Sequence, residues 1–307
     1  MNIAIIAPGR DVTVWKETIE KEAKGVNIQV YPEISSPENV DMVMLWQHPK
    51  GILKKFTNLK FISSMGAGVD HILNDPYLPE GIPVARIKDE KLTFSMTNYV
   101  VMGVLNFHRR LSHFQENQKK KRWDMKNPEI DVKVGVMGVG ALGGDVLDKL
   151  SYMGFDVYGY GNSPKEDFPF TYFHGKEGLK SFLDKVNVIA CLLPLTEQTE
   201  GFLNSDFFED CQKGTYLINV ARGKHLVEED LIKALKKGHI SGALLDVYSK
   251  EPLPKDHPFW DNEKITMTPH IASVTNPLAA APKIAENCRR WMEGKPLRNV
   301  VNQEKGY

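Results

Sequence analysis

Short apolar runs alternate with helical patterns along most of this 307-residue chain. This alternation is typical of an α/β protein, because parallel strands are joined by crossovers that are usually helices. In the first third, the pattern predicts strands at 2–7, 27–31, 41–46, 59–64 and 83–86. A second series predicts strands at 133–138, 156–160, 187–193, 215–220, 241–247 and 265–268.

Two helical patterns, at about 92–118 and 276–292, flank the second series of strands. We interpret them as the two places where the chain crosses between domains, since the chain is long enough for two cores. The predicted fold class is α/β, with two Rossmann-like or flavodoxin-like domains built on parallel sheets. One domain is predicted to combine 1–98 with 276–307, and the other to be inserted into it as 99–275.

The composition excludes several classes of function. Thirty-nine basic residues balance 39 acidic ones, so no overall field favours nucleic acid or an anionic membrane. The basic run at 119–122 is interpreted as a cationic helix end, because cations complement the helix dipole there. No apolar run approaches the roughly 20 residues that span a bilayer. Three scattered cysteines and a first strand without a basic leader favour a cytoplasmic location, and no metal is expected.

A glycine-rich loop follows the strand predicted at 133–138. Its pattern is GxGxxG, formed by Gly138, Gly140 and Gly143 with Ala141 and Leu142 between them, and a helical stretch comes next. In this setting the first glycine permits a tight turn, the second lets the backbone approach a pyrophosphate, and the third allows close packing. The helix N-terminus offers free N–H groups to phosphates. A turn without a ligand is the alternative, but the strand–turn–helix context favours dinucleotide binding.

The loop after the strand at 156–160 is expected to lie near the adenosine ribose of the dinucleotide. An NAD-preferring protein usually carries an acidic residue there, which binds the 2′-hydroxyl. This chain instead has Gly161, Asn162, Ser163 and Lys165. The last three can donate hydrogen bonds to a 2′-phosphate, and nothing repels it. We therefore predict NADP(H) as the preferred cofactor with NAD(H) as a possible one, and a shift toward NADH in Gly161→Asp.

Three titratable residues, Arg222, Glu251 and His270, each follow the end of a predicted strand within a few positions. Strand ends of this kind deliver side chains to the crevice where α/β folds bind ligands. Arginine can engage two oxygens of an anion, and histidine beside a carboxylate is a suitable acid near neutral pH. Each residue alone has a structural alternative: a surface ion pair, a turn residue or a buried imidazole. Together they predict binding of an anionic substrate and proton transfer.

Six segments across almost the whole chain resemble the D-isomer-specific 2-hydroxyacid dehydrogenases. They are the glycine loop and the segments 64–71, 193–199, 219–223, 245–247 with 251–253, and 268–270, in family order. Trp46, the short interval from Glu251 to His270 and the ending Gly306-Tyr307 resemble the bacterial glyoxylate/hydroxypyruvate reductase A branch. One departure is Asn98, where this branch often carries an acid.

The resemblance implies a role for each candidate substrate and catalytic residue. Arg222 would bind the carboxylate and carbonyl oxygens of a 2-oxo acid, with backbone N–H groups around Ala67 and Gly68 holding the carboxylate. His270 would protonate the carbonyl oxygen, and Glu251 would orient His270 and favour its protonated form. Trp46 is a candidate for the substrate wall, with core or interface packing as its alternative.

The resemblance also extends the cofactor site beyond the glycine loop. Asp246 would contact the nicotinamide carboxamide, and Pro194 and Thr199 would lie along the cofactor, as would Val220 and Ala221. The implied reaction is NADPH-dependent reduction of glyoxylate to glycolate and of hydroxypyruvate to D-glycerate. An NAD-linked dehydrogenase of a larger 2-oxo acid and a dinucleotide-sensing binding protein remain as alternatives. By resemblance the protein is expected to be a homodimer, with the helix near 92–118 as a candidate contact.

Overall fold

The structure is a computed structural model that describes residues 1–303 and 306, in two compact units. The first unit joins Met1–Leu92 to Thr275–Tyr307, and the second is Thr93–Val274. The chain enters the second unit within helix α3 (Glu90–His108) and returns just before helix α9 (Pro277–Met292). Tyr307, which contributed to the predicted branch, lies outside the described residues.

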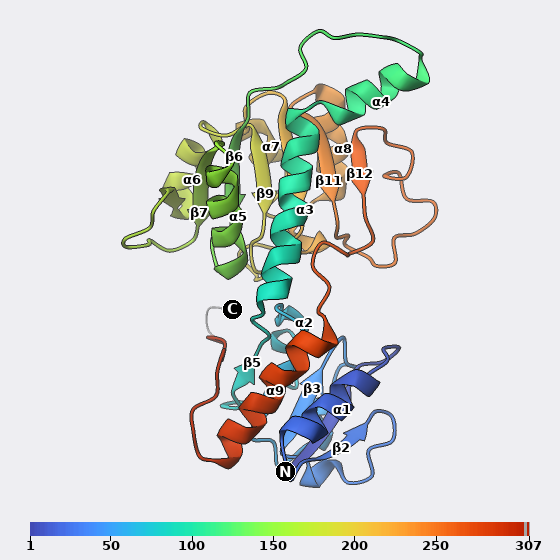
Figure 1. Ribbon diagram of the computed structural model, residues 1–307, viewed down its shortest axis with the longest axis vertical. Coiled ribbons are helices and arrows are strands. Elements are labelled where there is room, and N and C mark those ends of the chain that lie inside the picture. The colour runs from blue at the N-terminus through green and yellow to red at the C-terminus, as the bar shows by residue number, and fades with distance from the viewer. Residues whose placement is uncertain (304–305, 307) are drawn as a thin grey trace. The chain divides into compact units, whose positions relative to one another are not determined.

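The first unit is built on a parallel sheet, shown in blue and cyan in Figure 1. In its described residues the strand order is β2-β1-β3-β4-β5, the flavodoxin-like order. The strands are β1 (Asn2–Ile6), β2 (Asn27–Val30), β3 (Met42–Leu45), β4 (Phe61–Ser64) and β5 (Val84–Ala85). Successive residues of β1 face opposite sides, so Ile3 and Ile5 belong to one core cluster and Ala4 and Ile6 to another.

Helices cover both faces of the first sheet. Helix α1 (Thr13–Glu22) and α9 lie side by side and bury Trp15, Ile19 and Ala281 against one face. The other face is covered by short elements, which are the 3₁₀ helix η2 (Ile52–Lys55) and α2 (Asp70–Leu73). A further 3₁₀ turn, η1 (Pro37–Asn39), precedes β3. Burial on both faces explains why these strands appear in the sequence as continuous apolar runs.

The second unit contains a larger parallel sheet with the order β12-β11-β10-β9-β6-β7-β8 within the described chain. The strands are β6 (Lys133–Met137), β7 (Asp156–Gly161), β8 (Thr171–His174), β9 (Val188–Cys191), β10 (Thr215–Asn219), β11 (Ile240–Leu245) and β12 (Ile265–Met267). From β6 the chain adds β7 and β8 on one side of the sheet, and from β9 it adds β10, β11 and β12 on the other. The strand order therefore reverses between β6 and β9, and dinucleotides bind at such a switch point.

Helices lie on both faces of this sheet as well (Figure 1). One core cluster packs α6 (Gly175–Leu183), α7 (Ser205–Asp210) and α8 (Glu228–Lys237) against the sheet. A second cluster packs α3 and α5 (Ala141–Tyr152) against the other face, through residues such as Val104 and Leu147. The predicted class, α/β with two parallel-sheet domains, is confirmed.

Two details differ from the sequence-based expectation. The helix predicted at 92–118 is interrupted: α3 ends at His108 and α4 (Leu111–Lys119) begins after Arg110, whose φ of +54° cannot continue a right-handed helix. Strand β8 was not predicted, although Tyr172 and Phe173 have the aromatic character of a strand. It is a half-exposed edge strand that pairs only with β7 in the described sheet, which explains its weak apolar signal.

The three cysteines, Cys191, Cys211 and Cys288, are buried free thiols. Burial raises the pKa of each to about 12, so they remain protonated and pack as small apolar groups. Among residues 1–303 and 306, no helix has both the length and the apolar character needed to cross a membrane.

Candidate active site

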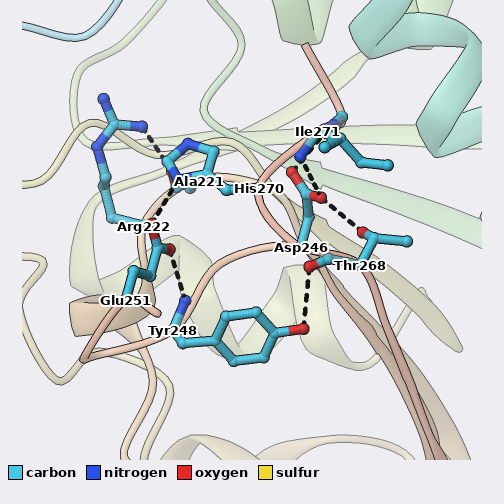
Figure 2. A network of polar contacts seen from close by, with 9 residues as sticks. Ala221, Arg222, Asp246, Tyr248, Glu251, Thr268, His270 and Ile271 are labelled. Atoms are coloured by element: carbon cyan, nitrogen blue, oxygen red, sulfur yellow. Dashed lines mark hydrogen bonds and ion pairs between the residues drawn. The ribbon is translucent and has the colours of Figure 1, made fainter. Parts of the chain in front are cut away.

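The three titratable residues predicted from the sequence follow three neighbouring strands of the second sheet. Arg222 comes after β10, Glu251 after β11 and His270 after β12, and these strands are adjacent in the order β12-β11-β10. Because parallel strands share a carboxyl edge, the loops that carry the three residues meet there. Figure 2 shows Arg222, Glu251 and His270 close together at this edge.

His270 and Glu251 form a hydrogen-bonded pair. The Nδ1 atom of His270 lies 2.8 Å from Oε2 of Glu251, and the side chains are 34% and 30% exposed. The other carboxylate oxygen, Oε1, accepts a 3.0 Å hydrogen bond from the backbone N–H of Tyr248. Since Glu251 engages Nδ1, the Nε2 atom of His270 is the nitrogen left to face a substrate.

Asp246 fixes the loop that carries His270. The residue is 1% exposed, and its carboxylate accepts hydrogen bonds from the hydroxyl of Thr268 and from the backbone N–H groups of Ile271 and Ala272. The backbone N–H of His270 also donates to the carbonyl oxygen of Asp246, at 2.8 Å. These bonds surround His270 at a φ of +57°, a left-handed conformation that is uncommon for residues other than glycine. The predicted contact of Asp246 with nicotinamide stays a prediction.

Arg222 begins a tight turn that is packed against the neighbouring loop. Its Nη1 donates a 2.7 Å hydrogen bond to the carbonyl of Ala221, and the side-chain amide of Asn219 donates to the carbonyl of Arg222 at 3.2 Å. Gly223 comes next and touches the backbone of Tyr248, where an added Cβ would lie 1.8 Å from the carbonyl carbon. Only glycine fits this position, so the Arg222 and Glu251 loops are packed directly together.

The pKa of Glu251 lies below its ordinary value. Burial alone would raise it, but hydrogen bonds from His270 and from the Tyr248 N–H outweigh that effect, and the charges of His270 and Arg222 add to the lowering. Glu251 therefore stays ionised near neutral pH.

We expect Glu251→Gln to destabilise the protein at neutral pH by an amount that shrinks in acid. A pKa lowered on folding stabilises the folded state above the unfolded value, close to 4.5, and this stabilisation is lost as the pH falls through the folded value. Urea unfolding at a series of pH values measures the difference. The exposed Glu197 provides a control, Glu197→Gln. If Glu251→Gln lowered the free energy of unfolding by the same amount at all pH values, the pairing of Glu251 with His270 would be contradicted.

The glycine loop between β6 and α5 has the geometry that a bound pyrophosphate requires. Gly138 has a φ of +94°, and a Cβ there would lie 2.4 Å from the carbonyl oxygen of Leu192. A Cβ at Gly143 would lie 2.3 Å from the carbonyl oxygen of Gly138, so strand and helix approach closely. Gly140 is different, because it is exposed and has nothing within 4 Å of its Cβ position. The residues thus fit a dinucleotide, whose phosphates would lie at Gly140, Ala141 and Leu142.

The loop after β7 holds the residues predicted to choose between the two cofactors. Asn162, Ser163 and Lys165 are exposed, and the Asn162 amide donates to the side chain of Gln198 at 3.3 Å. Gly161 is buried, and a Cβ there would lie 2.4 Å from the hydroxyl of Tyr172. Gly161→Asp is therefore a poor test of cofactor preference, because it would first have to displace Tyr172. The neighbouring Asn162 is the position where an acid can be introduced without a clash.

The Pro194–Thr199 turn is closed by its own threonines. The hydroxyl of Thr199 donates a 2.6 Å hydrogen bond to the carbonyl of Pro194 and accepts one from the N–H of Thr196 at 2.9 Å. The turn follows β9, next to the β6 loop in the strand order. Val220 and Ala221 follow β10, the next strand, and both are buried. All of these residues lie in loops at the carboxyl edge of one sheet, and their contact with a cofactor stays a prediction.

The substrate residues predicted in the first unit lie after β3 and β4, which are adjacent strands. The hydroxyl of Ser64 accepts from the N–H of Gly66 and donates to the carbonyl of Gly68, which shapes the loop. Within residues 1–303 and 306, the backbone N–H groups of Ala67 and Gly68 have no acceptor. Two such adjacent donors after a strand can bind a carboxylate.

Trp46 is half-buried and packs on the same loop. A Cβ at Gly66 would lie 2.7 Å from the ring carbon Cζ3 of Trp46, so the glycine makes room for the indole. The Trp46 ring lies 5.3 Å from that of His71, and the guanidinium of Arg10 lies 4.0 Å from its centroid. Trp46 therefore has a packing role, and contact with a substrate stays a prediction.

Sequence reasoning assigned no role to three polar residues that shape the site. Thr268 links Asp246 to the hydroxyl of Tyr99 on α3, and burial raises the pKa of Tyr99 to about 12. His225 is fully buried and bonded to the Arg222 turn. A single histidine near an Arg-Gly pair carries no signal of such burial, so only the fold reveals these partners.

Comparison with known proteins supports the predicted family. Residues 101–272 match the model of the D-isomer specific 2-hydroxyacid dehydrogenase NAD-binding domain. The chain is 38% identical, over the full length of both, to a Photorhabdus laumondii protein described as glyoxylate/hydroxypyruvate reductase A. It is 35% identical, again over both full lengths, to a protein of the same description from Yersinia enterocolitica.

Two solved structures resemble the whole chain. A D-isomer specific 2-hydroxyacid dehydrogenase from Xanthobacter autotrophicus, in complex with NADPH and MES, has a TM-score of 0.94 and 34% identity, covering 100% of this chain and 99% of its own. An NADPH-dependent glyoxylate/hydroxypyruvate reductase from Sinorhizobium meliloti, in complex with NADP and sulfate, has a TM-score of 0.89 and 31% identity, with the same coverage.

Proposed function

The chain belongs to the D-isomer specific 2-hydroxyacid dehydrogenase family, and from this we propose that it reduces small 2-oxo acids with NADPH. The predicted family is thereby confirmed, as is the assignment to NAD(P)-dependent oxidoreductases. The proposed substrates are glyoxylate, reduced to glycolate, and hydroxypyruvate, reduced to D-glycerate. The observation that carries the proposal is the His270–Glu251 pair beside Arg222, at the sheet edge that also bears the glycine loop.

The proposed chemistry divides the work among the three residues. Arg222 binds the carboxylate and carbonyl oxygens of the 2-oxo acid. When bound, the reduced nicotinamide supplies the hydride that adds to the carbonyl carbon. His270 gives the proton on Nε2 to the carbonyl oxygen, and Glu251 stabilises the positive charge that His270 carries before that transfer.

A panel of 2-oxo acids assayed with NADPH and with NADH tests this function. We expect glyoxylate and hydroxypyruvate to be reduced with NADPH at higher kcat/KM than 2-oxo acids with longer apolar chains. A preference for a longer 2-oxo acid with NADH would favour the alternative dehydrogenase. NADPH binding without oxidation, with every acid in the panel, would favour a dinucleotide-sensing binding protein. Homodimer formation and a cytoplasmic location also stay predictions.

NADP(H) preference is part of the proposal, supported by the absence of an acid at the end of β7 and by the NADP-bound relatives. We expect Asn162→Asp to reduce kcat/KM with NADPH by about tenfold while leaving NADH nearly unchanged, since a carboxylate repels the 2′-phosphate. Asn162→Ala is the control, because it removes the amide donor without adding charge. An unchanged NADPH to NADH ratio in Asn162→Asp would contradict the assignment of this loop.

A further inference from the structure

His225 lies three residues after Arg222, at the end of the 3₁₀ turn η3 (Gly223–His225), and none of its side chain is exposed. The backbone N–H of Arg222 donates a 3.2 Å hydrogen bond to Nδ1 of His225. On the other side of the ring, Nε2 lies 3.2 Å from the carbonyl oxygen of Pro194. One buried imidazole thus spans two separate segments of the candidate site.

The two partners determine which nitrogen of His225 carries the proton. Nε2 faces the carbonyl oxygen of Pro194, which can only accept, so Nε2 donates. Nδ1 lies 3.2 Å from the backbone nitrogen of Arg222 and 3.1 Å from its carbonyl oxygen, and in the neutral ring it accepts from the N–H. A neutral imidazole then carries its proton on Nε2, which donates to the carbonyl of Pro194. Both nitrogens of the ring are therefore used, which accounts for complete burial of a polar side chain.

The Pro194 carbonyl is also the acceptor for the Thr199 hydroxyl, at 2.6 Å, which closes the turn proposed to lie along the cofactor. Backbone bonds continue the connection beyond the imidazole. The N–H of Gly201 donates to the carbonyl of Lys224, and the N–H of Leu203 donates to the carbonyl of His225, both at 2.8 Å. The segment after β9 and the segment after β10 are therefore joined along their length.

We propose that His225 is a positioning residue that links the Arg222 backbone to the Pro194 carbonyl, so that the substrate anchor and the cofactor turn keep one geometry. The inference rests on the proposed function, which gives both segments their roles. Gly223 packs against the Tyr248 backbone on the Glu251 side, so the Arg222 turn is held from two directions. Small displacements of such an anchor matter, because a misplacement of about 1 Å can cost about 10²-fold in rate.

Three variants separate the two links. His225→Ala removes both, and we expect the KM for glyoxylate and the Kd for NADPH each to rise about tenfold. His225→Asn keeps an oxygen near the Nδ1 position that can accept from Arg222, so it should restore the KM but not the Kd. His225→Gln places an amide donor near the Nε2 position, so it should restore the Kd but not the KM. NADPH binding is measured by fluorescence and the KM by steady-state kinetics.

His239→Ala is the matched control. His239 precedes β11 at the amino end of the sheet, and its Nδ1 contacts the carbonyl of Phe208 at 3.4 Å, so it is another histidine bound to a backbone carbonyl but remote from the Arg222 turn. Its replacement should lower the melting temperature without changing either constant.

The proposal is overturned if His225→Ala lowers the melting temperature but leaves both constants unchanged. It is also overturned if neither His225→Asn nor His225→Gln restores its own constant. A wild-type protein that reduces no 2-oxo acid would instead refute the proposed function, and the NADPH measurements would still report on the link to Pro194.

Discussion

Replacing His270 with alanine is expected to lower kcat for glyoxylate by about 10²–10⁴-fold, the range that general acid catalysis contributes. The carbonyl oxygen would then have to take its proton from water. The Kd for NADPH should stay within about twofold of the wild-type value, since the contacts proposed for the dinucleotide belong to other loops. Pre-steady-state kinetics and NADPH fluorescence measure the two quantities separately.

Glu251→Gln is the companion variant to His270→Ala. An amide has one acceptor oxygen, so it can accept from Nδ1 only by turning its NH2 group toward the Tyr248 N–H, and it does not stabilise the imidazolium. The hydrogen bond to His270 can still form, so the loss in kcat should be smaller than that of His270→Ala. A His270→Ala protein with near-normal kcat would remove His270 from the role of acid.

Arg222→Ala is expected to lower kcat/KM for glyoxylate by about 10²–10³-fold, with a higher KM and a lower kcat. The loss of one partner of a hydrogen-bonded charge pair costs about 2–5 kcal/mol, and here the anionic substrate loses its fixed counter-charge. Arg222→Lys should recover only part of the activity, because an ammonium group cannot engage two oxygens in one plane.

Lys224→Ala is the control for Arg222→Ala. Lys224 lies two positions away in the same turn, is exposed and pairs with Glu200 at 3.6 Å. Its replacement by alanine therefore removes one positive charge without changing Arg222. Equal losses in Arg222→Ala and Lys224→Ala would show that only the overall charge of the loop matters. That result would exclude Arg222 as the residue that binds the carboxylate.

The sequence predicted the architecture because its strands are buried on both faces. Runs such as 187–193 are almost entirely apolar, and the alternation of such runs with helices has few solutions other than parallel sheets. The apolar pattern failed to predict the structure where a segment is only partly buried. Strand β8 is an edge strand with exposed ends. The helix is interrupted at Arg110 because this residue is left-handed, and an arginine in the sequence does not indicate a left-handed conformation.

The candidate site was predictable to the extent that its residues form linear motifs. Gly138, Gly140 and Gly143 have the spacing of the motif. Gly138 and Gly143 lie close to neighbouring backbone and Gly140 faces open space, as the motif implies. The roles of His225 and Thr268 were not predictable, because each has a partner that is distant in sequence, 31 residues away for His225 and 22 for Thr268. These contacts exist only after the strands are paired. Tyr172 likewise crowds Gly161 from a strand that the sequence did not reveal.

The most direct test of the central claim follows a label from cofactor to product. Wild-type protein is incubated with glyoxylate and with NADPH in which both hydrogens on C4 of the nicotinamide are replaced by deuterium. The product is examined by mass spectrometry and NMR. The account predicts glycolate with one deuterium on C2, formed at a rate that falls by about 10²–10⁴-fold in His270→Ala. Glycolate without deuterium, or labelled NADPH that binds and is never oxidised, would contradict reduction of 2-oxo acids by hydride transfer.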